Sequence, residues 1–454
     1  MELIDRFLER LRVCLEGAAE APRLPLNQLP VLTSTEEFQV LHHWQGKSQS
    51  FAEDYGISDL VARWAQIQPA ALAVRDGDRT VTYGHLLGWA DDLAHQLTET
   101  GVSRRDRVAV QASQSVEAIV AYLAVLRAGA TYIPFDFHQT SAEKQFWQHK
   151  LQARAVLSDR HLTQRRLHGP TALTPYLIST TNHNPPPHAV GVEGAPAYIL
   201  PGAGRLGHAV PITSRSLLST ITTSHPGSLH AEDVVLHAAH ASSPLAAQEI
   251  WGSLGRGAQI ACGPRRSDPA SFAQVVRNHQ ITAAFLPTTR LHRQVVHDLQ
   301  SLSGIRLMAT SGAALNPTIA RRMRQAFPMQ TLLHGYTAAE SAGFITIQTV
   351  DHADRGRPVP VGRPLPNGRV YILDERNLPV APQTVGELYV AGPGLADSYL
   401  DAPSATRHRF LADPFRPTVS ARMFRTGDLA CWQLDGTLQM VQHNDQATQR
   451  IATA

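Results

Sequence analysis

Apolar residues recur along the chain with two different periods, and segments of the two kinds alternate. Segments of about fifteen residues place apolar side chains three and four positions apart, as helices do. Others are short runs of β-branched and apolar residues, which are typical of strands. Strands that alternate with such helices predict an α/β protein whose parallel sheets are covered by helices on both faces. Helices are predicted over residues 85–100 and 115–129, and strands over residues 107–111, 130–134, 280–286 and 304–308.

The first fifty residues have a pattern of their own and predict a leader, residues 1–50, ahead of the α/β core. It begins with apolar residues at helical spacing between charged ones, and three prolines follow. Thr33 and Glu36 have the spacing of a capping box, which predicts the start of a second helix. Ser34 and Glu37 offer the same spacing one residue later.

The pattern changes again after Pro358. Short strands separated by turns follow, which is typical of a small β-barrel. We therefore predict a core over residues 51–441, whose barrel part covers about residues 358–441. The predicted barrel strands cover residues 369–374, 386–390 and 437–441.

Composition places the chain among globular proteins and limits its partners. Of its 454 residues, 43% are hydrophobic and 17% are charged, unlike the composition of disordered chains. The net charge is +3 and the arginines are scattered, so the sequence predicts no nucleic-acid partner. No apolar run is long enough to predict a membrane helix, and three distant cysteines predict neither a disulfide framework nor a zinc site. We therefore expect a cytoplasmic protein.

Lysine is almost missing. Lys47, Lys144 and Lys150 are the three lysines of the chain, so the last three hundred residues carry positive charge through arginine and histidine. A coding bias toward arginine explains such a shortage as well as function does. The shortage becomes informative where a motif requires an ammonium group.

Five motifs follow one another along the chain, at residues 126–136, 361–364, 386–388, 399–400 and 424–429. In order and spacing they resemble the motifs of the adenylation domains of nonribosomal peptide synthetases. These domains are members of the adenylate-forming superfamily of AMP-dependent synthetases and ligases. The resemblance implies a large N-terminal subdomain made of two αβαβα-type subdomains plus a small β-barrel. It also implies that the leader resembles the connector after a condensation domain.

The resemblance implies a reaction as well. In the family, a carboxylate is joined to the α-phosphate of ATP, pyrophosphate leaves, and the acyl group passes to a carrier-protein thiol. Negative charge accumulates at the phosphoryl centre, so the reaction depends on cations and aligned donors. ATP or AMP with magnesium is the implied cofactor. A condensation domain, a carrier protein or another synthetase subunit is the implied partner.

The resemblance assigns the nucleotide to residues late in the core. Asp428 is implied to accept hydrogen bonds from both ribose hydroxyls, because a carboxylate has two acceptor oxygens. Tyr336, which follows Gly335, is implied to pack on adenine, and Glu340 is implied to hold magnesium. Ala339 stands where the family has a threonine that contacts the phosphate. The adenine-site motif of the family is therefore only partly retained in this chain.

The predicted phosphate loop, residues 201–209, departs most from the family. Its hydroxyl side chains and its closing lysine are gone, and it is shorter than the family loop. Gly204 and Arg205 are the loop residues expected nearest to a bound nucleotide, and His208 is a second source of charge. A histidine is mostly neutral near pH 7. A planar guanidinium does not reproduce a compact ammonium.

A dinucleotide-binding fingerprint is the alternative interpretation of this loop, since Gly202, Gly204 and Gly207 have its spacing. That fingerprint needs a helix that opens at the third glycine and an acidic residue about twenty positions later. Pro211 lies where the helix should be established, and Glu232 comes too late. The sequence therefore disfavours the alternative.

The predicted substrate pocket is lined by His240, Pro244 and Gly312. Pro244 stands where family members that activate amino acids hold an aspartate for the substrate ammonium. Proline offers no such partner, and an unpaired buried ammonium costs on the order of several kcal/mol. An ordinary α-amino acid is thus not expected, whereas aryl and hydroxy acids remain open. His237 and His240 lack a third metal ligand, which favours a role as pocket wall.

Residues 442–454 resemble a remnant of the hinge at which the family's C-terminal subdomain begins, and we expect that subdomain and its catalytic lysine to be absent. With the altered phosphate loop, this predicts a pseudoenzyme with no catalytic residues, which acts as a scaffold or interaction module of nonribosomal peptide biosynthesis. Two alternatives remain. One is an enzyme that adenylates a non-amino carboxylic acid, with Arg205 in place of the lysine or a subdomain supplied by a partner. The other is a fragment of a longer synthetase.

Overall fold

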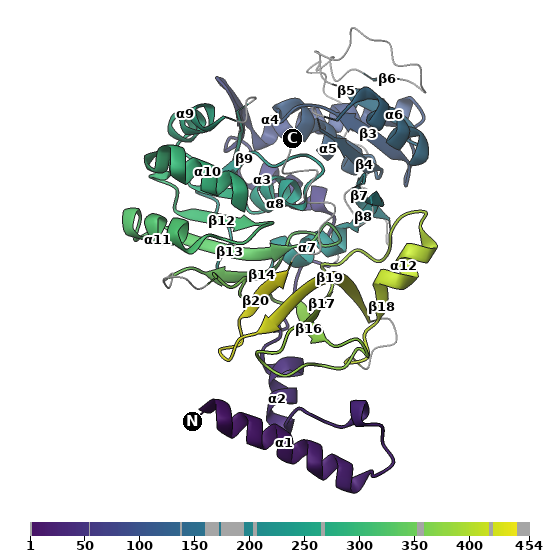
Figure 1. The fold of residues 1–454 in the computed structure, drawn as a ribbon. Helices are drawn as coiled ribbons and strands as arrows, with labels where there is room; N and C mark the ends of the chain where they lie inside the picture. Colours follow the sequence, from purple (N-terminus) through teal and green to yellow (C-terminus); the bar gives the residue numbers. More distant parts are fainter. Residues whose placement is uncertain are drawn as a thin grey trace.

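The computed structural model describes residues 2–53, 55–136, 139–158, 172–173, 195–202, 207–264, 268–351, 358–416 and 421–442. These residues form sheets of six, nine and five strands. Figure 1 shows the two larger sheets beside each other, the smallest sheet next to them, and helix α1 (Glu2–Glu20) at the far end of the molecule. The predicted fold class, an α/β protein with a small β-barrel part, is confirmed.

The six-stranded sheet follows the predicted alternation of strands and helices. Across the sheet its strands are β6 (Ala172–Leu173), β5 (Ala155–Ser158), β3 (Arg107–Gln111), β4 (Thr131–Phe135), β7 (Pro196–Leu200) and β8 (Val210–Thr213). All neighbours run parallel except β7 and β8. Helix α5 (Val116–Arg127) is buried except at Glu117, because it contacts both β3 and β4 and also strand β1 (Leu72–Asp76) of the larger sheet. Helices α4 (Tyr83–Glu99) and α6 (Ser141–Lys150) belong to the same part of the chain.

The nine-stranded sheet is parallel in its centre and antiparallel at its edges. Its strands are, in order, β15 (Arg363–Pro364), β14 (Phe344–Thr349), β13 (Thr331–Thr337), β12 (Leu307–Ser311), β11 (Ala283–Pro287), β9 (Val234–His237), β10 (Gln259–Cys262), β1 and β2 (Arg79–Thr82). Every residue of β9 and β12 is buried, as expected for parallel strands covered on both faces. The helices of this part are α3 (Ile57–Ile67), α7 (Ser214–Ile221), α8 (Pro244–Leu254), α9 (Pro269–His279), α10 (Thr288–Asp298), η5 (Leu299–Leu302) and α11 (Pro317–Ala326).

The five-stranded sheet lies in the region where the sequence predicts the barrel part, and it is antiparallel throughout. It contains β16 (Arg369–Leu373), β17 (Gly386–Ala391), β18 (Phe410–Ala412), β19 (Arg422–Trp432) and β20 (Leu438–Gln442), with helix α12 (Pro403–Arg409) before β18. The pairing of β17 with β19 shifts between Glu387 and Tyr389, where Gly427 has a φ of +78°. Such a bulge redirects the side chain beside it, and the side chain of Asp428 is buried here.

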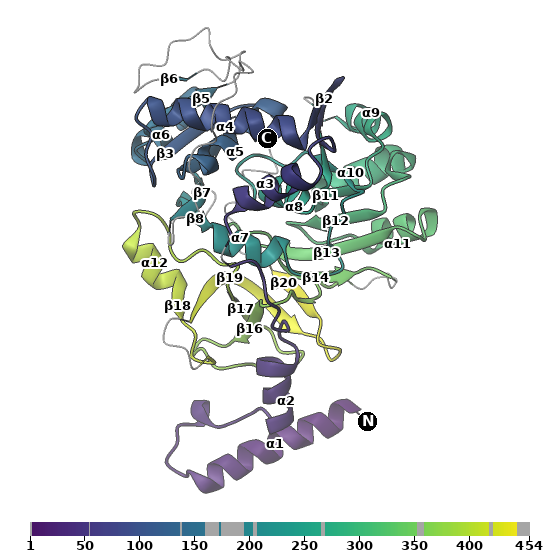
Figure 2. The ribbon, with the colours of Figure 1, turned by 180° about the vertical axis from the view of Figure 1, so that it is seen from behind.

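The second half of the leader packs on the barrel. The capping box forms with Thr33 and Glu36, whose amides and side chains bond reciprocally at 3.1 and 3.2 Å. It begins α2 (Ser34–Phe38), which follows η1 (Leu26–Gln28) and continues into the one-turn helix η2 (Gln39–His43). Trp44 then packs against Trp432 with ring centroids 5.5 Å apart. Helix α1 lies beyond this contact, at the end of the molecule away from the large sheets (Figure 2). Among the described helices, none is long and apolar enough to cross a membrane.

Candidate functional site

Several candidate residues lie where parallel strands of the nine-stranded sheet end. His240 follows the end of β9, Gly312 directly follows β12, and Glu340 follows β13. In open α/β sheets, ligands bind outside the carboxyl ends of the strands. The fold therefore brings these residues to the edge where a ligand site is expected.

Gly335 is required by strand pairing. A Cβ atom at this position would lie 2.3 Å from the carbonyl oxygen of Thr346 in the neighbouring strand β14. Such a distance is far inside van der Waals contact, so only glycine lets β13 and β14 pair here. Packing alone accounts for this glycine.

Tyr336 and Asp428 are brought together although 92 positions separate them in the sequence. The Tyr336 hydroxyl donates a hydrogen bond of 2.6 Å to Oδ2 of Asp428, and both side chains are buried. The Asp428 amide in turn donates to Oγ1 of Thr426, which donates to the carbonyl oxygen of Leu388 in the paired strand. The carboxylate predicted to bind ribose thus already accepts a strong bond from the ring predicted to contact adenine.

Glu340 is engaged in a similar way. The Tyr399 hydroxyl donates to Oε1 of Glu340 at 2.6 Å, and both side chains are buried. The ring of His208, in the predicted phosphate loop, lies 5.1 Å from the ring of Tyr399. The structure therefore brings Glu340 and His208 into contact with one tyrosine. Within the described residues, no three histidine, cysteine, aspartate or glutamate side chains gather as a metal site.

The predicted phosphate loop connects two antiparallel strands. Leu200 of β7 pairs with Val210 of β8, and helix α7 begins only at Ser214. The dinucleotide fingerprint requires a helix directly after the glycines, so the structure contradicts that alternative. Gly204 and Arg205 lie outside the described residues, as do residues 443–454 of the predicted hinge.

A buried carboxylate that the sequence analysis did not identify holds the turn after β9. Glu249 of α8 is fully buried and accepts hydrogen bonds from the amides of Ala238 and Ala239. Its Oε2 also lies 2.7 Å from Nδ1 of His237. From the other side, Arg290 of α10 donates to the carbonyl oxygen of Ala238 at 3.0 Å. His237 is therefore part of the wall that supports this turn.

Asp136 holds the next part of the same turn from the six-stranded sheet. Its carboxylate accepts bonds of 2.6 Å from the amide of Ala241 and 2.7 Å from the hydroxyl of Ser242. The His240 ring forms an ion pair with it at 3.8 Å. The two subdomains are therefore tied together at the edge of the candidate site.

The ion pair of His240 predicts a pH dependence of stability. Asp136 beside it raises the pKa of His240. A raised pKa means that the protonated ring stabilises the folded state, so this contribution is complete below about pH 6.5 and is lost as pH rises through the folded pKa. Because the ring is 51% exposed, we expect less than about 1 kcal/mol.

Urea unfolding of the wild type and His240→Gln, each at about pH 5.5 and pH 8.5, measures this contribution. The wild type should lose more stability than the variant between the two pH values. The comparison removes the effects of the neighbouring Asp136, Glu249 and Arg290, which both proteins share. Equal losses in the two proteins would show that the pair contributes nothing.

Pro244 and Gly312 differ in what they offer a ligand. Pro244 is the first residue of α8, where its fixed φ suits a helix start and Ser243 caps the helix. Gly312 has a φ of +86°, and a Cβ there would meet no atom of the described residues within 4 Å. Beside it lies Ser311, whose hydroxyl is 3.2 Å from that of Thr337. The strand ends near Gly312 thus combine open space with neutral hydroxyl groups.

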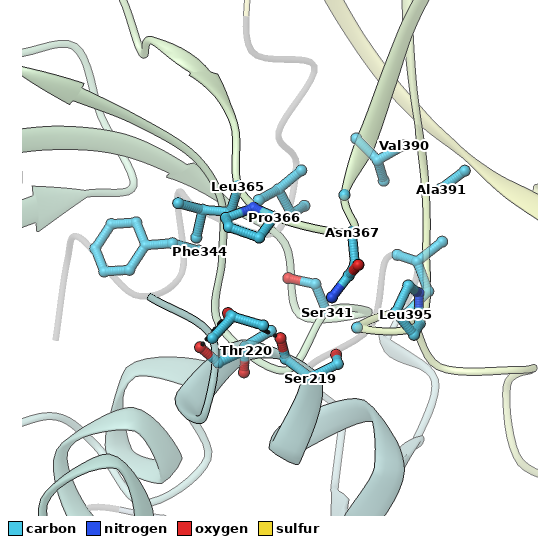
Figure 3. Close-up of a pocket in the computed structure, with 15 residues that line it drawn as sticks. Ser219, Thr220, Ser341, Phe344, Leu365, Pro366, Asn367, Val390, Ala391 and Leu395 are labelled. Atoms are coloured by element: carbon cyan, nitrogen blue, oxygen red, sulfur yellow. Dashed lines mark hydrogen bonds between the residues drawn. The ribbon is translucent and has the colours of Figure 1, made fainter. Parts of the chain in front are cut away.

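A small cavity lies elsewhere, between α7 and the barrel part. Figure 3 shows Ser219 and Thr220 approaching it from α7, with Leu365 and Asn367 on the opposite side. Its volume is about 30 Å³, which accommodates one or two water molecules. None of the predicted site residues lines it, so the cavity and the candidate site do not coincide.

Comparison with known proteins gives one consistent result. A family model described as AMP-binding enzyme matches residues 61–400. Malpibaldin synthetase of Mortierella alpina is 27% identical over 452 residues, which cover 97% of this chain and 8% of that protein. The N-terminal subdomain of Klebsiella oxytoca NpsA, in complex with 3-hydroxybenzoyl-AMSN, has a TM-score of 0.77 at 24% identity and covers 88% of this chain and 99% of that one. The AMPPNP-bound nonribosomal peptide synthetase FmoA3 has a TM-score of 0.86 at 22% identity, covering 97% and 48%.

Proposed function

Since the chain belongs to the family of AMP-binding enzymes, with the fold of nonribosomal peptide synthetase adenylation domains, we propose that it is an adenylation-type domain that has lost the adenylation reaction and acts as an interaction module. It spans only 6% to 19% of the length of the curated relatives. Its activity, substrate and partners are therefore inferred from its own residues.

The observation that carries the proposal is that both carboxylates assigned to the nucleotide are committed to internal bonds. Asp428 accepts from Tyr336 and Glu340 accepts from Tyr399, each at 2.6 Å and each in a buried position. A hydrogen bond to a charged group contributes about 1.5–3 kcal/mol. Each bond occupies one acceptor position of its carboxylate, which leaves fewer positions for a ribose hydroxyl or a magnesium ion and lowers the affinity for that ligand.

The two ends of the nucleotide fit the chain unequally. The nucleoside end fits, because Tyr336 offers an aromatic ring and Asp428 a carboxylate. The phosphate end does not, because residues 201–209 contain no serine, threonine or lysine and Ala339 has no hydroxyl. Phosphoryl transfer depends on donors and cations around the phosphates. This mismatch supports loss of the reaction while leaving room for a bound nucleoside.

An α-amino acid substrate is disfavoured by the carboxylates around Pro244. Glu249 is already satisfied by two backbone amides and His237, and Asp136 by Ala241, Ser242 and the His240 ring. Neither is available to a substrate ammonium, and a buried ammonium without a partner costs on the order of several kcal/mol. The site thus favours a ligand without an amino group.

Adenylation of a non-amino carboxylic acid is the second candidate function. The open space at Gly312 and the hydroxyls of Ser311 and Thr337 favour it, because a neutral polar wall suits an aryl or hydroxy acid. This function requires Arg205, or a subdomain supplied by a partner, to replace the missing cation. A condensation domain, a carrier protein or another protein of a nonribosomal peptide synthetase is the proposed partner in either case, in the cytoplasm.

Calorimetric titration with adenosine and with ATP and magnesium tests the proposal. We expect the wild type to bind both weakly and with similar affinity, because residues 201–209 offer the phosphates neither a hydroxyl nor a lysine. Tyr336→Phe keeps the ring but removes the hydroxyl that donates to Oδ2 of Asp428, so adenosine affinity should rise about tenfold, which corresponds to about 1.4 kcal/mol.

Tyr399→Phe is the matched control, because it removes the same kind of bond at Glu340 and should leave adenosine affinity unchanged. Wild-type binding of ATP and magnesium more than about a hundredfold tighter than adenosine would mean that phosphate recognition is intact. That outcome would favour the enzymatic alternative instead.

A further inference from the structure

Helix α1 exposes its apolar face to solvent, whereas an ordinary amphipathic surface helix buries it. Ile4, Phe7, Leu8, Leu11 and Leu15 are between 43% and 66% exposed. A surface helix normally buries its apolar stripe against the core. A contiguous exposed apolar surface on a folded protein marks a contact with another molecule.

The other face of α1 attaches the helix to the protein. Arg10 forms an ion pair of 2.6 Å with Glu36 and donates to the carbonyl oxygen of Pro382 at 3.2 Å. Gly17 packs against the ring of Pro30, where a Cβ would lie 2.6 Å from the nearest ring atoms. Residues 10 and 17 are seven positions apart and so share a face. The helix is thus held by a polar and small face, while its apolar stripe faces outward.

The stripe has the spacing of a coiled-coil seam. Ile4, Leu8, Leu11 and Leu15 follow one another at intervals of four, three and four residues. This alternation keeps apolar side chains facing a partner helix, and Phe7 flanks the seam on the edge opposite to Asp5 and Arg12. The occupant expected for this surface is therefore another helix with a matching seam.

We propose that α1 pairs in antiparallel orientation with α1 of a second copy of this chain. Asp5 and Arg12 flank the seam on the same edge, next to Ile4 and Leu11. Antiparallel pairing brings equal edges together, so Asp5 of each copy faces Arg12 of the other. Parallel pairing would place this charged edge against Phe7 instead. The charges are self-complementary in one orientation alone, and the resulting contact is closed and two-fold symmetric.

Sedimentation of the full chain between about 1 and 100 μM tests the proposal. The wild type should reach twice its mass of 49.6 kDa as concentration rises. The double variant Leu8→Glu with Leu11→Glu should weaken self-association at least about a hundredfold, since it places four carboxylates in the seam. Val385→Glu with Leu434→Glu changes two exposed apolar residues of the barrel part in the same way and should associate like the wild type.

A charge exchange tests the orientation. Asp5→Arg alone should weaken the dimer several-fold, and adding Arg12→Asp should restore it, although Arg12 also bonds Glu9 and Glu16 of its own helix. Circular dichroism of each variant verifies that α1 stays helical. The proposal is overturned if the chain remains monomeric over the whole concentration range, and the apolar stripe would then be assigned to a contact with a different protein. It is also overturned if the dimer persists in the variant with Leu8→Glu and Leu11→Glu. Absence of rescue by the exchange overturns the antiparallel pairing.

Discussion

Replacing Glu249 with alanine is expected to destabilise the folded protein by about 3–5 kcal/mol. The carboxylate is fully buried and accepts hydrogen bonds from the amides of Ala238 and Ala239, each with a shortest N–O distance of 3.0 Å. It also faces the buried ring of His237. Without it, several buried donors lose their acceptor, and each such loss costs about 1–3 kcal/mol. The turn that precedes α8 would then lose its internal support.

Urea unfolding at about pH 7 measures the effect. Glu249→Gln retains one acceptor oxygen and should cost less than the alanine variant. Glu99→Ala removes a carboxylate that is 66% exposed and should change stability by no more than about 0.5 kcal/mol. If Glu249→Ala cost as little as Glu99→Ala, the buried carboxylate could not be what holds the turn.

The elements of the fold were accessible from the sequence because their patterns are local. Strand β3 has the predicted bounds. The ends of helices α4 and α5 and of strand β4 lie one or two residues from the predicted ones. Of the two capping boxes that the sequence allows, the one with Thr33 and Glu36 forms, and both of its partners lie within one turn. The motif resemblance was also sufficient to select Tyr336 and Asp428, which the fold brings into direct contact.

The residues that hold the turn at the candidate site could not be predicted from the sequence in the same way. Asp136 reaches a turn 105 positions away, and Arg290 reaches Ala238 from another helix. No local period or spacing marks such partners, because the packing of whole sheets decides which side chains meet. The glycine spacing at residues 202–207 shows the converse, since a local pattern suggested a nucleotide fold that the strand β8 contradicts.

At the phosphate loop, the lysine shortage bears on function and is not explained by coding bias alone. A preference for arginine over lysine would leave the hydroxyls of this loop in place, yet residues 201–209 contain none, and Ala339 has lost another. Removal of a single transition-state donor typically slows a reaction about 10²- to 10³-fold. Two such losses predict adenylation about 10⁴-fold slower or more than in an active relative where they add fully, and at least about 10²-fold slower where they do not.

Transplanting residues 201–209 into the corresponding loop of an active adenylation domain isolates this effect. The recipient should lose pyrophosphate exchange at least about 10³-fold while its folding and its adenosine binding stay unchanged. A recipient that keeps its activity would show that this loop still supports the reaction.

ATP–pyrophosphate exchange by this chain itself tests the central claim most directly. To make the phosphate loop the deciding factor, the chain is fused after Gln442 to the C-terminal subdomain of an active relative, and amino, aryl and hydroxy acids are each supplied. Loss of the reaction predicts no acid-dependent exchange above the enzyme-free background with any of them. Reproducible exchange that depends on one acid, and that disappears with Asp428→Ala, would contradict the account and identify the chain as a working adenylating enzyme.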